Sequence, residues 1–353
     1  MQTGVLIIGQ GISGTFLSWY LRKQGVDFLV VDNNYVNAPS RVAAGVINPV
    51  TGRRLVTVWM AEQLFPFAWQ AYNEIGDELG ITVISQKNIL DLFPNPFMRE
   101  SFLKKIEEGD QYVSLYEEHD RLGEYFNYEF GCGEIKPVYT AHIDSLLPAW
   151  RKELARTKNL LEENFDLTQL DISGNSVRYK DITADKIIFC DGPGCADNPY
   201  FNKLPFAANK GEALVVEIPG LPNTHVYKKS MLLVPLQQKD HFWIGSSYAW
   251  DFENADPSAE FRESTLAILK NWLRVSHKLV EHRSGLRPAT LERRPFAGLH
   301  PVHTQVGILN GMGTKGCSLA PFFAKQLADH LLHDTPIAKD ADVRRFTKIL
   351  SRS

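Results

Sequence analysis

Short apolar runs alternate with amphipathic stretches along the chain, and their order indicates a mixed α/β protein. Residues 5–8 (Val-Leu-Ile-Ile) are an uninterrupted apolar run of strand length, as expected for a strand buried on both faces of a parallel sheet. Residues 16–21 follow with apolar side chains four positions apart, which is the spacing of one face of a helix. A second apolar run, residues 28–31, ends at Asp32. Together these segments predict one βαβ unit at the start of the chain.

The rest of the chain repeats this alternation. Helices are predicted over residues 56–80, 143–158 and 256–274, and a last helix contains Pro321 near its start and reaches Leu332. Asp256 and Pro257 suit the N-cap and the first position of the third helix. Strands are predicted at residues 81–84, 160–165, 186–190, 212–218, 231–236, 241–247 and 306–310. The α/β pieces thus lie at the start, middle and end of the chain, with strand-rich insertions between them.

Length, composition and charge narrow the class of protein. The chain has 353 residues, 44% of them apolar, which suits about two globular domains of roughly 150 residues each. The charge balance of 38 − 41 = −3 is too neutral for a broad DNA-binding or membrane-binding surface. No apolar stretch reaches the roughly 18 residues of a spanning helix, and the N-terminus lacks the basic leader of a secretory signal. We therefore expect a soluble, cytoplasmic protein that does not bind DNA.

Cysteines and local charge add little chemistry. The four cysteines form no Cys-x-x-Cys pair, so we expect reduced thiols and no metal site (Cys132, Cys190, Cys195 and Cys317). Residues 107–134 carry nine acids against one arginine, which is typical of a solvated face. The last fifteen residues hold five basic and two acidic side chains and indicate a frayed or surface-docked tail.

The turn after the first predicted strand has the pattern G-x-G-x-x-G, with its glycines at Gly9, Gly11 and Gly14. It follows a strand, opens a helix, and Asp32 lies 18 residues after its last glycine, which is the context of a dinucleotide site. In such a site the three glycines permit a tight turn, close approach to a pyrophosphate, and close helix–strand packing. Amides at the helix start donate to the phosphates. Asp32 would accept from a ribose hydroxyl and repel a 2′-phosphate, which argues against NADP.

Two further strand-to-glycine turns occur at residues 191–194 and 311–316. An NAD enzyme needs one such turn. If all three turns converge on one sheet, the ligand touches both ends of the sequence, which suits a long ligand such as FAD.

Five separated motifs resemble the D-amino-acid oxidase/glycine oxidase family of FAD-dependent oxidoreductases, and the resemblance spans most of the chain. They are residues 9–32, residues 40–49, residues 188–194, the segment Gly285-Leu286-Arg287-Pro288-Ala289-Thr290, and residues 311–321. The fourth motif is the most specific.

The resemblance implies an α/β fold (α+β overall) with a Rossmann-like FAD-binding domain and a β-rich substrate domain. Residues 1–75, 140–205 and 285–335 are expected to form the first domain, residues 76–139 and 206–284 the second, and residues 336–353 a C-terminal tail.

The resemblance also implies the residues that hold FAD. They are Gly9, Gly11, Ile12, Ser13, Gly14, Asp32, Asn33, Arg41, Ala43, Ala44, Gly45, Gly192, Gly194, Arg287, Gly311, Gly313, Thr314, Lys315 and Gly316. Small residues suit the flavin end, because only Gly and Ala let the backbone approach a planar ring. Sarcosine-oxidase-like relatives carry a cysteine beside the position of Leu286 or Arg287 that links to the flavin. This chain has none, so non-covalent FAD is expected.

The implied reaction is hydride transfer to flavin N5 from the carbon next to a substrate amine, followed by hydrolysis of the imine and reoxidation by O2. Arg287 is expected to hold the carboxylate of an amino acid or amine substrate, with a structural ion pair as the alternative. Tyr248 is expected to border the substrate pocket or to be a half-buried core residue. Lys315 is expected to face the flavin ring or to be solvated.

Two departures from the family pattern concern the substrate. Leu232 stands where relatives that act on small amino acids often have a tyrosine, and residues 312–314 stand where they tend to have His and Arg. One carboxylate anchor would then remain in a more apolar pocket, so the substrate need not be glycine or sarcosine.

Three other functions stay open. Residues 43–54 and 311–321 also look like the oxidase half of the bifunctional tRNA wobble-uridine modification enzyme. RNA binding needs a basic face, and only Arg53-Arg54, Arg293-Arg294 and the tail supply basic residues, so tRNA ranks below a small amine. An aromatic hydroxylase of similar architecture and a flavin-binding protein without enzyme activity are the other two.

Overall fold

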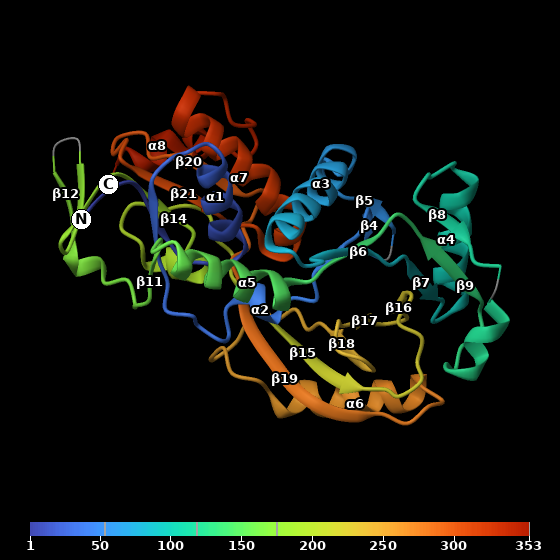
Figure 1. Cartoon of the computed structure of the whole chain (residues 1–353). Helices are drawn as coiled ribbons and strands as arrows, with labels where there is room; N and C mark the ends of the chain where they lie inside the picture. Colours follow the sequence, from blue (N-terminus) through green and yellow to red (C-terminus); the bar gives the residue numbers. More distant parts are fainter. Residues whose placement is uncertain (53, 118, 174–175, 353) are drawn as a thin grey trace.

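The computed structural model describes residues 1–52, 54–117, 119–173 and 176–352, and it confirms a mixed α/β fold (Figure 1). Two eight-stranded sheets dominate it, one in the half of the molecule that holds both chain termini and one that extends into the other half. Arg53, one of the basic residues noted above, lies outside the described residues.

The first sheet is mainly parallel and has the strand order β11-β2-β1-β14-β13-β12, while β21 pairs with β14 and β20. Its strands are β1 (Gln2–Ile8), β2 (Phe28–Val31), β11 (Leu160–Leu161), β12 (Leu170–Ser173), β13 (Ser176–Tyr179), β14 (Ile182–Phe189), β20 (Phe296–Leu299) and β21 (Val306–Asn310). Alternate residues of β1 explain why this strand is apolar throughout. Val5 and Ile7 pack in the core cluster that contains the helices, whereas Leu6 and Ile8 pack in a cluster on the opposite face.

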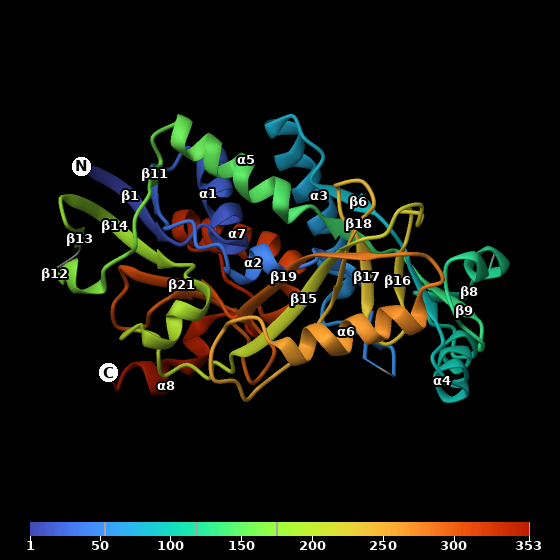
Figure 2. The same ribbon diagram turned by 90° about the horizontal axis from the view of Figure 1, so that it is seen from below.

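The helices on the first of these faces come from distant parts of the chain. They are α1 (Ile12–Lys23), α3 (Ala61–Leu79), α5 (Ile143–Arg156) and α7 (Gly316–His333). Their packing joins the start, the middle and the end of the chain around one core, as Figure 2 shows for α1, α5 and α7. None of the helices in the described part of the chain is both long and apolar enough to cross a membrane.

The second sheet has the order β19-β15-β18-β17-β16-β7-β9-β8. Its strands are β7 (Ile89–Leu92), β8 (Val113–Leu115), β9 (Cys132–Ile135), β15 (Asn209–Glu217), β16 (Val226–Lys228), β17 (Leu232–Pro235), β18 (His241–Gly245) and β19 (Lys278–Arg287). Helix α6 (Ala259–Trp272) packs along it through Leu269 and Trp272 (Figure 2).

The remaining elements connect these parts. They are α2 (Pro39–Val42), α4 (Pro96–Glu107), α8 (Thr347–Leu350), the strands β3 (Val46–Ile47), β4 (Val50–Thr51), β5 (Val56–Thr57), β6 (Ile84–Gln86) and β10 (Tyr139–Ala141), and the 3-10 turns His119–Glu124, Leu167–Gln169, Gly192–Asp197, Gly313–Lys315 and Val343–Phe346. The tail is docked, because Val343 and Leu350 are buried against the first sheet. The predicted domain boundaries stay a prediction.

Several predicted boundaries were wrong, each for a local reason. The helix predicted from residue 56 begins at Ala61, because residues 56–57 pair with β4 in a hairpin. Helix α6 is capped by Ser258 rather than Asp256, since the Ser258 hydroxyl accepts the Phe261 N–H. The strand predicted at residues 81–84 lies at Ile84–Gln86, and that predicted at 160–165 is limited to Leu160–Leu161.

The strand register brings the three glycine turns together. Ile8 of β1 is paired with Phe189 of β14, which is paired with Ile308 of β21, and all three strands are parallel. The turns at residues 9–14, 191–194 and 311–316 therefore leave the same edge of the sheet. The carboxyl edge of such a sheet is where ligands bind in open α/β proteins.

We expect Gly14→Ala to destabilise the protein, because a Cβ at this position would lie 1.9 Å from the carbonyl oxygen of Gly9. Overpacking against fixed backbone should lower the free energy of unfolding by about 1–3 kcal/mol in urea titrations. Gly123→Ala is the matched control, since a Cβ there meets no atom within 4 Å. Equal stability of the two variants would contradict the close packing of α1 on β1.

Candidate functional site

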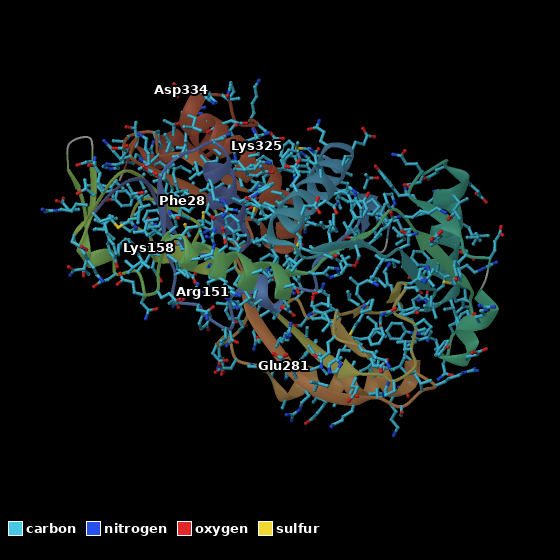
Figure 3. The ribbon with its side chains drawn as sticks, in the orientation of Figure 1. Phe28, Arg151, Lys158, Glu281, Lys325 and Asp334 are labelled. Carbon is cyan, nitrogen blue, oxygen red and sulfur yellow. The ribbon has the colours of Figure 1, made fainter. Side chains whose placement is uncertain are left out.

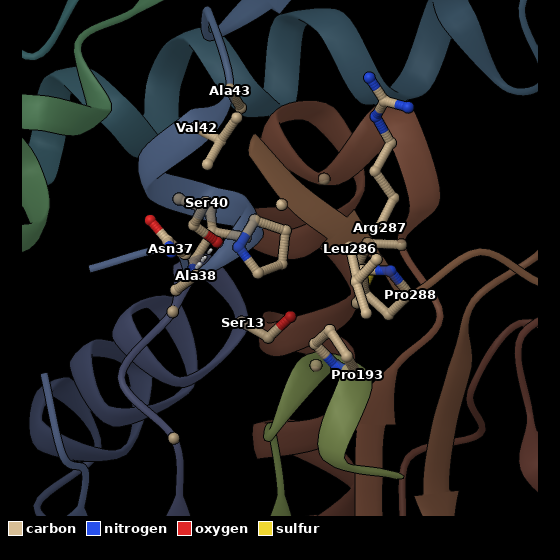
Figure 4. Close-up of a pocket in the computed structure, with 18 of the residues that line it drawn as sticks. Ser13, Asn37, Ala38, Ser40, Val42, Ala43, Pro193, Leu286, Arg287 and Pro288 are labelled. Atoms are coloured by element: carbon tan, nitrogen blue, oxygen red, sulfur yellow. Dashed lines mark hydrogen bonds between the residues drawn. The ribbon is translucent and has the colours of Figure 1, made fainter. Parts of the chain in front are cut away.

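A cavity of about 880 Å³ lies at the carboxyl edge of the first sheet and extends to the second sheet. It is within the size range of cofactor and ligand sites. Figure 4 shows residues of three distant segments around this space, among them Ser13, Pro193 and Arg287. Residues 9, 11–13, 191–194 and 312–316 also line the cavity, so the three glycine turns converge on it.

The first glycine turn has the geometry that its sequence pattern predicts. Gly9 has a φ of +98°, and a Cβ there would lie 2.6 Å from the Cys190 carbonyl oxygen, so a larger residue is excluded. Gly11 lines the cavity and precedes the first residue of α1. The Ile12 amide donates to Ser40 Oγ at 3.1 Å, which satisfies one of the free N–H groups at the helix start.

Asp32 lies in the cavity wall and is held by several donors. Its carboxylate accepts the backbone N–H of Gln10 at 2.8 Å and an Nη1–H of Arg151 at 2.6 Å. Arg151 extends from α5 (labelled in Figure 3) and is 9% exposed. Sequence reasoning missed Arg151, because nothing in the pattern of α5 identifies which of its charged residues turns inward. The arginine neutralises Asp32 and fixes its orientation toward the cavity.

Small residues occur at positions 43–45 and 311 for two different reasons: some line the cavity, and others pack closely against neighbouring backbone or side chains. Ala43, Ala44 and Gly45 line the cavity. A Cβ on Gly45 would also lie 1.9 Å from the Ala141 carbonyl oxygen, so this glycine is required by the adjacent strand β10 as well. Gly311 has a φ of +76° and packs against Thr290 behind the cavity wall.

Most of the predicted cofactor residues line this one cavity. They are Gly9, Gly11, Ile12, Ser13, Asp32, Asn33, Ala43, Ala44, Gly45, Gly192, Gly194, Arg287, Gly313, Thr314, Lys315 and Gly316. Three others are not among its lining residues: Gly14, which packs on Gly9; Gly311; and Arg41, which donates to Asn34 and lines a smaller neighbouring pocket. The cofactor roles of all these residues stay predictions.

Arg287 is positioned by neutral oxygen atoms. Its Nη1 donates to Asn209 Oδ1 at 2.8 Å, its Nη2 donates to Ser246 Oγ at 2.8 Å, and both reach the Ser247 carbonyl oxygen at 3.2 Å. Among the residues that the structure describes, no carboxylate forms an ion pair with it, which removes the alternative of a structural ion pair. Desolvation lowers the pKa of Arg287, but an arginine remains protonated at neutral pH. The cavity thus holds a cation without a counter-charge.

Space for Arg287 depends on a glycine that sequence reasoning missed. Gly211 on β15 lies next to it, and a Cβ there would lie 2.0 Å from Arg287 Nη2. Strand pairing places Asn209 of β15 opposite Arg287 of β19, which explains why Asn209 can hold the guanidinium. Only strand pairing identifies these two residues, because they lie more than seventy positions before Arg287.

Lys315 is a second cation of the cavity. Its Nζ donates to Asn48 Oδ1 at 3.0 Å, and no carboxylate of the described chain lies within ion-pair distance of it. Desolvation lowers the pKa of this lysine to about 8. The alternative of a solvated lysine is therefore not what the structure shows.

Tyr248 lines the rim of the cavity and is 49% exposed, so it is not a core residue. The guanidinium carbon of Arg287 lies 5.5 Å from the centre of its ring, and Trp250 packs edge-on against the ring. Both aromatic residues are therefore on the solvent side of Arg287.

The cavity is suited to a flavin dinucleotide by several independent features. Gly9 and Gly11 leave the start of α1 open, Asp32 lies at the end of β2, and backbone and small side chains line the space near residues 43–45. Two uncompensated cations stand at the end that contains Arg287 and Lys315. Within the described ranges, no group of three metal-ligating side chains is present.

Comparisons with known proteins identify the family and the fold. Residues 4–330 match the family described as FAD dependent oxidoreductase. The structure is also similar to three solved enzymes, each over almost the whole of both chains. They are iminodiacetate oxidase (IdaA) from Chelativorans sp. BNC1 (21% identity, 96% and 98% of the two chains covered, TM-score 0.76), glycine oxidase from Bacillus cereus ATCC 14579 (19%, 96% and 99%, 0.78) and L-proline dehydrogenase from P. horikoshii (15%, 98% and 98%, 0.77).

The chain therefore belongs to the FAD-dependent oxidoreductase family. It is an oxidoreductase whose family uses FAD, as the glycine turns predict. The three solved structures are each less than 25% identical in sequence to this chain, so they establish its fold and do not identify its substrate.

We expect Lys315→Met to stabilise the FAD-free protein at pH 7, because it removes a partly desolvated charge that has no carboxylate partner in the described chain. The unfolded lysine has a pKa near 10.5 and the folded one near 8, so the unfolded chain binds more protons between these values. Stability of the wild type then rises with pH across this window, and the variant should not follow it. The difference in unfolding free energy should be on the order of 2 kcal/mol at pH 7 and shrink by pH 9.5.

Urea denaturation of both proteins at pH 7 to 9.5 measures this difference. Lys325→Met, which removes a surface lysine paired with Asp329, controls for the loss of a lysine charge. A difference that is absent at pH 7 or constant with pH would show that Lys315 is well hydrated.

Proposed function

We propose that this protein oxidises a C–N bond of an amino acid or a carboxylate-bearing secondary amine with FAD, and that O2 is the electron acceptor. The observation that carries the proposal is Arg287, a cation inside the cofactor cavity whose partners are all neutral. An uncompensated, partly buried guanidinium favours an anionic ligand, and a carboxylate matches its planar fork.

The neutral partners of Arg287 give it a fixed direction. Asn209 and the Ser247 carbonyl hold its terminal nitrogens from one strand and one loop of the second sheet. Tyr248 covers the guanidinium face. A substrate carboxylate bound here would therefore be held in a defined orientation, which is the main contribution that a protein makes to hydride transfer.

FAD, when bound, supplies the redox chemistry by taking a hydride from the carbon next to the amine nitrogen. The amine must be neutral before that carbon can lose a hydride. Lys315 lines the same cavity as Arg287, and its positive charge would disfavour a protonated substrate amine there and so lower the pKa of that amine. Loss of the hydride from carbon and of a proton from nitrogen would leave an imine, which water would hydrolyse to a carbonyl compound and either ammonia or, from a secondary amine, a primary amine. O2 would take the two electrons from the reduced flavin and become hydrogen peroxide.

Anaerobic mixing with a panel of amino acids and N-methylated amines tests the proposal. At least one carboxylate-bearing compound should bleach the flavin absorption band, and air should restore the band. Failure of every amine to reduce the flavin would contradict amine oxidation. Reduction by NADPH instead would favour the hydroxylase alternative.

Arg287→Lys should lower kcat/KM for a carboxylate substrate by about 100-fold, because lysine keeps the charge but loses the bidentate fork. Arg283→Lys is the matched control on the same strand, where the arginine is paired with Asp144 and Glu281. Steady-state kinetics with the best substrate of the panel give both values. Equal effects of the two substitutions would remove Arg287 from substrate binding.

The yellow colour of the purified protein should stay in the supernatant after acid precipitation. No cysteine stands beside Leu286 or Arg287, so non-covalent binding is expected. Absorbance spectra of pellet and supernatant measure the outcome, and colour that remains in the pellet would show a covalent bond.

The tRNA-directed activity stays a prediction with less support. Arg294, one of its basic residues, already packs over the Trp59 ring at 4.2 Å. Incubation with bulk tRNA and nucleoside analysis would detect loss of a modified nucleoside.

A further inference from the structure

A carboxylate stands at the centre of the sheet edge where the glycine turns meet. Asp191 is the second residue after β14, and the parallel register places it between Gln10 after β1 and Asn310 at the end of β21. Asn310 Nδ2 donates to Asp191 Oδ1 at 3.1 Å, which confirms that the two side chains meet. A Cβ on Gly9 would lie 3.2 Å from the Asp191 Cα. Asp191 therefore flanks the turn that would hold a pyrophosphate.

The partners of this carboxylate carry no positive charge. Besides Asn310, its donors among the described residues are the Cys195 thiol and its own backbone N–H. In the described part of the chain no lysine, arginine or histidine forms an ion pair with Asp191, although it lines the cofactor cavity. This contrasts with Asp32, which Arg151 neutralises.

None of the other titratable groups described around Asp191 neutralises its negative charge. Cys190 and Cys195 are buried thiols whose pKa values burial raises well above their ordinary range, so both stay neutral. Asp32 faces the same turn from β2 and Asp197 lies at the end of the same 3-10 turn, and both are acidic. Lys315 lines the same cavity from the C-terminal turn, where it donates to Asn48.

Negative charge on Asp191 conflicts with the ligand of this cavity. The pyrophosphate of FAD is anionic, and the glycine turn at the start of α1 that would hold it lies beside Asp191. Like charges in a poorly solvated site repel, and the least costly relief is protonation of the carboxyl group.

We propose that Asp191 is a cofactor-contacting residue that is protonated in the FAD complex, so that binding of FAD takes up one proton. The inference rests on the cofactor of the family and not on the amine substrate. Desolvation already raises the pKa of Asp191 to about 7 without a ligand, which keeps the proton within reach at physiological pH. A protonated carboxyl group can also donate a hydrogen bond, which a carboxylate cannot.

The sign of the pH dependence follows from this linkage. Below about pH 7 the free protein already carries the proton, and the affinity for FAD should be constant. Above it, each pH unit should raise the dissociation constant of FAD by up to about tenfold, because the complex holds a proton that the free protein lacks.

Titration of the FAD-free full-length protein with FAD from pH 5.5 to 9 measures this dependence through quenching of flavin fluorescence. The dissociation constant of the wild type should rise by about tenfold or more between pH 6.5 and 8.5. Asp191→Asn, which keeps the shape and removes the ionisation, should bind FAD with little change over this range. Asp185→Asn is the matched control, because Asp185 is exposed on β14 and is not among the residues that line the cavity, so it should leave the wild-type slope intact.

Three results are decisive. A flat wild-type profile overturns the proposal. An Asp191→Asn variant that binds FAD more weakly at every pH with the wild-type slope also overturns it, because the carboxylate would then act as an acceptor and another group, such as Lys315, would cause the slope. Loss of the slope in Asp191→Asn with its retention in Asp185→Asn supports it.

A measurement that needs no Asp191 variant guards against a substitution that prevents folding. Calorimetric titration of FAD at pH 8 in buffers of different ionisation enthalpy gives the number of protons taken up by the wild type and by Lys315→Met, which removes the other cavity group that titrates near this pH. Uptake approaching one proton in both proteins supports the proposal, and no uptake in Lys315→Met overturns it. Neither experiment uses a substrate, so failure of the proposed amine oxidation would not alter the result.

Discussion

The contact between helix α1 and the turn after β1 is the constraint on which the cofactor site depends. Gly14 lets the first turn of the helix rest against the Gly9 carbonyl, and Gly9 lets the turn pass beside the Cys190 carbonyl of β14. Both approaches exclude any side chain. They bring the free N–H groups of α1 to the edge of the sheet, where parallel strands from three parts of the chain end. Larger residues would move the helix away and separate these groups from the other glycine turns.

Some charged groups of the cavity have a partner of opposite charge and others do not. The unpaired groups are the ones to which we assign roles in ligand binding. Arg287 and Lys315 carry positive charge with neutral partners. Asp32 is neutralised by Arg151, whereas Asp191 forms no ion pair with a cation of the described chain. Each uncompensated group is costly in the free protein, since burial of a charge without a partner is unfavourable. A bound carboxylate would relieve the cost at Arg287, and a bound proton would relieve the cost at Asp191.

The second sheet positions the substrate end through backbone pairing. Strands β15 and β19 pair over almost their whole length, which places Asn209 and Gly211 beside Arg287. The loop after β18 contributes Ser247 and Tyr248 to the same guanidinium. The arginine is thus fixed by several segments of a rigid sheet, and its direction does not depend on one flexible loop.

The sequence by itself determined the βαβ unit, the three glycine turns and the residues Gly9, Asp32, Arg287 and Lys315, because these features follow from local periodicity, turn chemistry or a short motif. It also indicated that the turns would converge. Only the tertiary structure decided that Arg151, Gly211 and Asn209 belong to the site and that Asp191 lacks a cation. These facts depend on strand register and on which face of a helix turns inward, and both are set by packing between segments more than seventy residues apart.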